Sequence, residues 1–313
     1  MDESLTPLMQ AAKENDIEKI NECLEQRGNA DGGQSDLTKQ DRFGETALMK
    51  AILNGHVEPV MLLAEYECGY TDKEGKNALI HAVEKNNLEA VKLLLGYVSE
   101  RNYAKEDGTT ALITAAEYGR AECVELLRGY QAGRQNRYGW TALMLAASHG
   151  YSACVDLLIH EAGKRTAEAS HWGSKYPIGA TALIIAVICR RLDIVLRLLP
   201  YEFGIPDSNG HTALWHARYH QLREIEQILM VEASIPPNFH RLVAPDHSQF
   251  VPGELDWLRR YIHALGHVVV QRVDTDEIGE LEARLEESES NQMSLLREVC
   301  RYRDKYGPLD ESG

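Results

Sequence analysis

The sequence has no long uninterrupted run of apolar residues. The longest one, Ala182–Cys189, is far shorter than the roughly 20 residues that a membrane-spanning helix needs. The first ten residues, MDESLTPLMQ, are acidic and polar, so they have neither the basic start nor the apolar stretch of a signal peptide. We therefore expect a protein that is not inserted into a membrane.

The sequence also has fewer positively than negatively charged residues. The chain of 313 residues carries 33 Lys and Arg against 48 Asp and Glu, for a net charge of −15. Phosphate backbones and anionic lipid surfaces repel such a protein. We therefore expect no nucleic-acid partner.

Paired cysteines are missing. None of the six cysteines forms a C-x-x-C pair, and no N-x-S/T glycosylation sequon occurs. This pattern argues against a zinc knuckle and against a thioredoxin-like motif. Reduced thiols in the cytoplasm are the simplest interpretation.

Signatures of catalysis are absent as well. The sequence contains no P-loop, no G-x-G-x-x-G, no H-E-x-x-H, no G-x-S-x-G and no H-R-D or D-F-G pair. His263 and His267 have the i, i+4 spacing of helical zinc ligands, but no third ligand is evident. The remaining histidines are scattered, and His81 and His216 share one repeat position. We therefore expect no enzyme, no metal site and no cofactor.

What the sequence does contain is one segment repeated seven times. Its copies, such as TALMKAI and TALITAA, begin at Thr6, Thr46, Asn77, Thr110, Thr141, Thr181 and Thr212. Most copies start about 31–33 residues after the previous one, and loop insertions lengthen two of the spacings.

Each copy has the same internal order. The opening Thr or Asn suits a helix N-cap, and A-L-[MI]-x-A-[AV] places small and large apolar residues on one helical face. Gly55, Gly119 and Gly150 are placed to end the first helix in a left-handed conformation. A second apolar pattern follows, and then a D-x-x-G turn such as Asp41–Gly44. This order predicts an all-α solenoid of helix-turn-helix units over residues 1–231.

These residues resemble the ankyrin-repeat family, whose motif is close to D-x-x-G-x-T-P-L-H-x-A-A-x-x-G followed by E-x-V-x-L-L. The motif proline survives only as Pro7, and the motif histidine is replaced in every copy. The T-A-L-M style is similar to the ankyrin families expanded in some parasitic flagellates. Within the repeats, Cys123 and Cys154 fall at the start of a second helix, where we expect buried small apolar side chains.

The family resemblance implies that turn tips and first-helix positions bind a protein partner. The matching aromatic and histidine positions, together with those of an insertion at 163–179, are Phe43, Tyr118, Tyr138, Trp140, His149, Trp172, Tyr176, Tyr219 and His220. Aromatic rings at exposed tips would serve as contact anchors. The alternatives are that the rings pack locally over neighbouring tips and that the insertion is an ordinary surface loop.

The repeat pattern stops before the last quarter of the chain. Four prolines mark 232–253 as a linker, 254–273 reads as a capping or connecting helix, and 307–313 as a flexible tail. Residues 274–306 show apolar positions at spacings of three and four, which predicts a short coiled coil. Its seam contains Ile278, Leu281, Leu285, Leu295, Val299 and Tyr302. The segment 278–306 would form a homodimer or pair with a helix of a partner. The alternative is a lone helix that docks on the array.

These features together favour a protein-binding scaffold or adaptor of unknown partner. A regulatory or targeting subunit of an enzyme such as a kinase is one alternative, and a linker associated with the cytoskeleton is another. The binding surface of a solenoid varies without disturbing its repeat core, so the fold does not name the partner.

Overall fold

The structure is a computed structural model that describes residues 5–25, 36–97, 105, 107–167 and 176–230. The predicted linker, connecting helix, coiled coil and tail at 232–313 lie outside the described residues, as does Cys300. Within the described part the chain forms fourteen α-helices and no β-strand. These are α1 (Pro7–Glu14), α2 (Ile17–Glu25), α3 (Ala47–Asn54), α4 (Val57–Glu67), α5 (Ala78–Glu84), α6 (Leu88–Leu95), α7 (Ala111–Glu117), α8 (Ala121–Gln131), α9 (Ala142–His149), α10 (Ser152–Leu158), α11 (Ala182–Ile188), α12 (Leu192–Glu202), α13 (Ala213–Tyr219) and α14 (Arg223–Leu229). A short 3-10 helix, η3 (Ile159–Glu161), follows α10.

The first helix of each repeat begins where the opening residue predicts. The Thr6 hydroxyl accepts a hydrogen bond from the Met9 backbone N–H at 3.2 Å, and the Asn77 side chain accepts one from Ile80 at 2.9 Å. The same cap forms in the other described repeats except at Thr212, whose side chain makes no capping bond. A side-chain oxygen thus satisfies one of the orphan N–H groups at the helix start.

The expected helix ends are also confirmed. Gly55 and Gly150 follow α3 and α9 with φ angles of 79° and 84°. Gly119 plays the same part after α7, with a φ angle of 66°. Where the sequence lacks glycine, Arg190 and Gln221 adopt left-handed angles of 59° and 58°. Every repeat therefore turns the chain sharply enough for its second helix to run back along the first.

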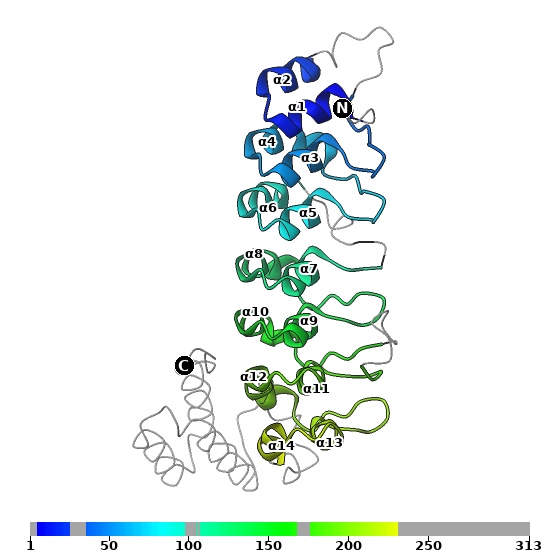
Figure 1. Cartoon of the computed structure of the whole chain (residues 1–313), viewed down its shortest axis with the longest axis vertical. Coiled ribbons are helices and arrows are strands. Elements are labelled where there is room, and N and C mark those ends of the chain that lie inside the picture. Colours follow the sequence, from blue (N-terminus) through cyan, green and yellow to red (C-terminus); the bar gives the residue numbers. More distant parts are fainter. Residues whose placement is uncertain (1–4, 26–35, 98–104, 106, 168–175, 231–313) are drawn as a thin grey trace, which may run out of the picture. The chain divides into compact units, whose positions relative to one another are not determined.

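The chain divides into two units, which are described separately. In the first, up to residue 137, the first helices α1, α3, α5 and α7 pack in sequence, and the second helices α2, α4, α6 and α8 pack beside them (Figure 1). Alanine and larger apolar side chains from both rows fill the space between neighbouring pairs. Small residues at the contact let adjacent helices approach closely.

The second unit, from residue 138, repeats this packing. Helices α9, α11 and α13 contact one another in order, and α10, α12 and α14 form the accompanying row. Cys123 in the first unit and Cys154 in the second are buried as expected. No disulfide bond joins the cysteines of the described residues. Within the same residues, no helix combines the length and apolar character needed to cross a bilayer.

Long turns project from the row of first helices (Figure 1). In the first unit the Lys73 N–H donates to the carbonyl oxygen of Phe43 at 3.0 Å, which joins one tip to the next. Gly44 stands at this contact with a φ angle of 81°, and a Cβ there would lie 2.7 Å from the Lys73 nitrogen. Only glycine fits both the conformation and the space, which explains the last residue of the D-x-x-G turn.

Candidate protein-binding surface

The second unit carries an exposed aromatic stack on α13. The rings of His211 and Trp215 are parallel with centroids 3.6 Å apart, and those of Trp215 and Tyr219 are 5.0 Å apart at 10°. Trp215 and Tyr219 are four residues apart and lie on one face of α13, whereas His211 stacks on Trp215 from the turn that precedes the N-cap Thr212. Trp215 is 39% exposed and Tyr219 is 68% exposed. His220 contacts Tyr219 edge-on at 5.2 Å and extends the surface.

Of these residues the sequence analysis singled out Tyr219 and His220. It missed Trp215, which replaces the histidine of the family motif in this repeat. The signal that would have found it is the i, i+4, i+8 series from His211 to Tyr219. An exposed ring has no packing reason to lie there, so the whole stack belongs to the candidate surface.

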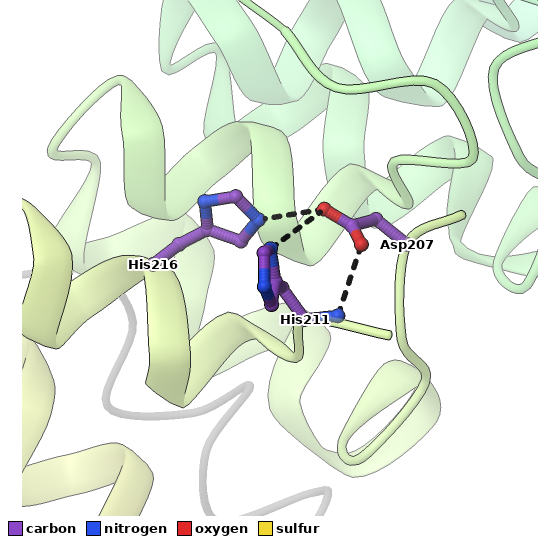
Figure 2. Close-up of side chains that lie close together, drawn as sticks. All are labelled: Asp207, His211 and His216. Carbon is purple, nitrogen blue, oxygen red and sulfur yellow. Dashed lines mark hydrogen bonds and ion pairs between the residues drawn. The ribbon is translucent and has the colours of Figure 1, made fainter. Parts of the chain in front are cut away.

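Next to the stack, Asp207 faces two imidazoles (Figure 2). One of its carboxylate oxygens, Oδ2, lies 3.0 Å from His216 Nε2 and 3.9 Å from His211 Nδ1. The other, Oδ1, accepts the backbone N–H groups of Asn209 and His211 at 2.8 and 2.9 Å. The turn thus holds the carboxylate in a fixed orientation. Sequence reasoning placed these residues in a turn and a helix but did not bring them together.

Burial and hydrogen bonding set the protonation of this cluster. Burial opposes ionisation of Asp207, but hydrogen bonds from the His211 N–H, the His216 ring and the Asn209 N–H lower its pKa below the ordinary value. Burial lowers the pKa of His216, although Asp207 counteracts it. At neutral pH the pair is therefore an ionised carboxylate beside a neutral imidazole.

Trp140 corrects one expectation from the sequence. We predicted an exposed anchor at a turn tip, but its side chain is buried, with 1% exposure. Tyr176, from the end of the insertion, packs edge-to-face on Trp140 with centroids 5.1 Å apart. Burial and the contact with the Cys189 thiol raise the pKa of Tyr176. The ring pair is local packing, which is the alternative that the sequence left open.

The other predicted residues of this unit lie apart from the stack. Tyr138 is half-buried, and its carbonyl oxygen accepts the Ala167 N–H at 2.9 Å. His149 is exposed at the end of α9 and stacks on Tyr151 at 5.6 Å. Trp172 lies outside the described residues.

In the first unit, Phe43 stands at a turn tip as the sequence predicts. Its ring is 52% exposed, and the Arg42 guanidinium lies 4.7 Å from the ring centroid. The turn beneath is braced because the Asp41 carboxylate accepts the Phe43 N–H at 2.9 Å and pairs with Lys50 Nζ at 2.7 Å. An exposed ring on a fixed base suits a contact residue.

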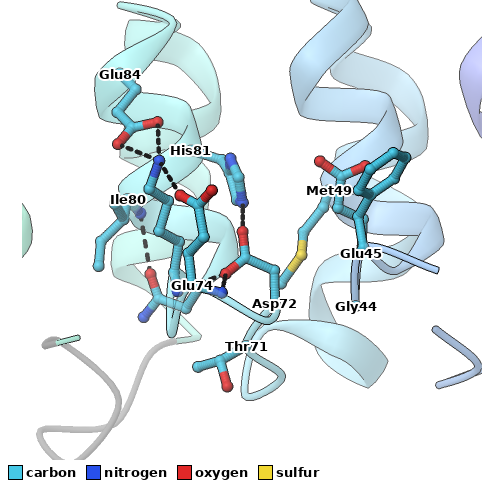
Figure 3. Close-up of polar contacts among 12 residues, drawn as sticks. Gly44, Glu45, Met49, Thr71, Asp72, Glu74, Ile80, His81 and Glu84 are labelled. Carbon is cyan, nitrogen blue, oxygen red and sulfur yellow. Dashed lines mark hydrogen bonds and ion pairs between the residues drawn. The ribbon is translucent and has the colours of Figure 1, made fainter. Parts of the chain in front are cut away.

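Tyr118 is exposed at the end of α7 in the same unit. Burial, followed by the charges of Glu84 and Glu117, raises the pKa of its phenol. Glu84 also pairs with Lys76 Nζ at 3.0 Å, and the lysine contacts Glu74 at 3.0 Å (Figure 3). Charged side chains therefore lie near this aromatic position.

The repeated helix pairs, capped starts, left-handed helix ends and projecting turns define a solenoid of the class that binds through its variable surface. Comparison with family models gives the same result, because the model for ankyrin repeats in three copies matches residues 8–103 and 97–169. The chain belongs to the ankyrin-repeat family.

A solved structure of low sequence identity shows the same fold. The ankyrin repeat domain of Bcl-3, described as a unique member of the IkappaB protein family, is 22% identical, with a TM-score of 0.57 over 71% of this chain and 97% of that one. An ankyrin repeat domain from Acinetobacter baumannii AYE is 24% identical over 72% of this chain and 97% of its own, with a TM-score of 0.44. The ankyrin repeat protein EF0377 is 26% identical over 58% of this chain and 96% of its own, with a TM-score of 0.48. The comparison with curated proteins gave no match.

Proposed function

We propose that this chain is a scaffold or adaptor that binds a protein partner through its first helices and turn tips, with Trp215 and Tyr219 on α13 as the main anchors. Ankyrin repeats generally mediate protein–protein interaction. The single observation that supports the choice of anchors is the exposed, parallel stack of His211, Trp215 and Tyr219.

The stack suits binding for an energetic reason. Trp and Tyr are enriched among the residues that dominate interface energies, because each ring buries a large area on contact. Here each ring is already held by its neighbours, so little side-chain freedom remains to be lost on association. His220 extends this surface, while Phe43 and Tyr118 in the first unit, with His149 in the second, are secondary contact positions.

The C-terminal segment supplies a second contact in this proposal. Residues 278–306 associate as a short coiled coil, and the chain acts in the cytoplasm. Size-exclusion chromatography with light scattering tests the self-association. Leu281→Asp with Leu285→Asp would convert a dimer into a monomer, whereas an unchanged mass for the wild-type chain at the monomer value would contradict the dimer.

An affinity capture from the native cell tests the binding role. The full chain is compared with the double variant Trp215→Ala/Tyr219→Ala and with Tyr130→Ala as a matched control, because Tyr130 is an exposed aromatic on a second helix, α8. The proposal expects specific proteins that are retained by the control and lost from the double variant. Circular dichroism establishes that all three chains are folded.

Two results would count against the proposal. Equal capture by the wild type and the double variant would remove the α13 stack as the anchor. A capture that recovers no specific protein with any chain would contradict the adaptor role. A kinase among the captured proteins would indicate that the chain is a regulatory or targeting subunit of that enzyme. A filament protein would indicate a cytoskeletal linker.

A further inference from the structure

The cluster of Asp207, His211 and His216 offers three metal-binding atoms from one turn and the helix after it. No two of these atoms are more than 4.8 Å apart. In a tetrahedral zinc site with bonds of roughly 2.0–2.1 Å, the ligand atoms stand about 3.3 Å from one another. The distances of 3.0 and 3.9 Å from Asp207 Oδ2 to the two imidazole nitrogens bracket that value.

We propose that Asp207, His211 and His216 bind one divalent cation of the zinc class, with one coordination position left open. Two imidazoles and a carboxylate form a donor set typical of zinc sites that keep a position for water or another ligand. The open position lies on the side of His211, which is partly exposed, while Asp207 and His216 are buried. Cation binding is a further role beyond the protein binding proposed above, although His211 and Trp215 belong to both surfaces.

Binding requires one proton to move. Without a cation, His216 Nε2 lies 3.0 Å from Asp207 Oδ2 and donates its hydrogen bond to that carboxylate. Binding replaces this hydrogen bond with bonds from both groups to the cation, and the imidazole proton is then carried on Nδ1. A buried carboxylate with a dication is also better compensated than one beside a neutral ring.

The repeats provide an internal comparison. In the third repeat Asp72 and His81 make the same pair at 2.9 Å (Figure 3), and in the second repeat Asp41 pairs with Lys50. The turn therefore needs a basic partner nine residues after its Asp, but it does not need a third group. At the position of His211 the third repeat has Lys76, which cannot bind a metal while charged.

Trp215 orients the added ligand. The face of the His211 ring stacks on Trp215, and its Nδ1 edge is directed toward Asp207 (Figure 2). Partners that fix the plane of a ligating imidazole belong to working metal sites, because they reduce the cost of ordering the ligand. The stack on Trp215 thus orients His211 beside the hydrogen-bonded pair of Asp207 and His216.

Metal uptake by the full chain tests the site. The wild type is compared with His211→Ala, which removes one proposed ligand and leaves the pair of Asp207 and His216 intact. The control is His220→Ala, which removes a neighbouring histidine outside the cluster. Isothermal titration with Zn²⁺ measures stoichiometry, and Co²⁺ spectra report ligand type. The wild type and His220→Ala should each take up one more equivalent than His211→Ala, with cobalt bands that lack thiolate charge transfer. Loss of the ligand should weaken binding by more than the roughly 10–100-fold that loss of a supporting partner costs.

A second variant makes the test independent of any damage to the fold. Lys76→His places the same three donors in the third repeat, where Ile80 stands in place of Trp215, and should add one further but weaker equivalent of Zn²⁺. Equal uptake by the wild type and His211→Ala would overturn the proposal, as would a wild type that binds no Zn²⁺ in the micromolar range. Failure of Lys76→His to bind any additional Zn²⁺ would contradict the proposal that an aspartate with histidines four and nine residues later holds the cation.

Discussion

The carboxylate of Glu202 accepts a hydrogen bond from the backbone N–H of Leu183 at 2.6 Å, which ties the end of α12 to the start of α11 in the same repeat. Its other oxygen accepts the Gly163 N–H at 2.8 Å. Glu67 makes the same bond to Leu48 at 2.7 Å. Buried carboxylates thus satisfy helix N–H groups that the capping threonines leave unpaired.

Replacing Glu202 should show how much this contact stabilises the repeat. Glu202→Ala leaves the buried Leu183 N–H without an acceptor, at about 1–3 kcal/mol, whereas water can satisfy the N–H of the exposed Gly163. Removal of a buried charge partly offsets this loss. We expect the free energy of unfolding to fall by about 2 kcal/mol. Glu202→Gln keeps an acceptor for Leu183, as Gln131 does for Leu112 at 2.8 Å, and should lose less.

Chemical denaturation followed by circular dichroism measures both variants. Glu224→Ala, at an exposed position on α14, is the control and should change the unfolding free energy little. An Ala variant as stable as the wild type would show that the buried contact contributes nothing.

The same side chain predicts a dependence on pH. Burial raises the pKa of Glu202, against the hydrogen bonds from Gly163, Leu183 and Thr181. A pKa that is higher in the folded protein than in the unfolded chain stabilises the fold while the carboxyl is protonated. This contribution is fully present below the pKa of the unfolded chain, about 4.3, and is lost as the pH rises through the pKa of the folded protein. Glutamine does not titrate. The stability of Glu202→Gln relative to the wild type should therefore increase between about pH 4 and pH 7.

Denaturation curves across this pH range check the sign. Burial also raises the pKa of Glu67, so Glu67→Gln should show the same trend. A relative stability that falls with rising pH in both variants would mean that the hydrogen bonds outweigh burial.

The packing of Tyr176 on Trp140 gives a third prediction. Tyr176→Ala should expose Trp140 and lower the free energy of unfolding by about 1–2 kcal/mol, because an aromatic pair loses its contact and its buried area. Acrylamide quenching in a chain whose other tryptophans are replaced by Phe measures the exposure. Tyr176→Phe should keep Trp140 protected, since the ring remains. Equal quenching of Trp140 in the wild type and Tyr176→Ala would contradict the packing role.

The sequence was sufficient for the repeat and its local chemistry. Capping residues such as Thr6 and helix-ending glycines such as Gly150 act through neighbours a few residues away, so a single motif contains the whole interaction. Seven copies in register then fix the stacking of helix pairs.

Contacts between distant segments were not predictable in the same way. Trp140 occupies a tip position by motif, but it is buried and Tyr176, from the distant end of the insertion, packs against it. The stack on α13 was within reach of the sequence, because its spacing is helical. It was missed because Trp215 stands at a motif position that is apolar and buried in the other repeats.

The central claim is that Trp215 and Tyr219 on α13 anchor a protein partner. The most direct test measures the affinity of a captured partner for this surface. Isothermal titration compares the wild type, Trp215→Ala/Tyr219→Ala and Tyr130→Ala, all as full chains. The account predicts at least about a tenfold increase in Kd for the double variant, or roughly 1.4 kcal/mol, and less than about a twofold change for the control. Equal Kd values for the wild type and the double variant would contradict it.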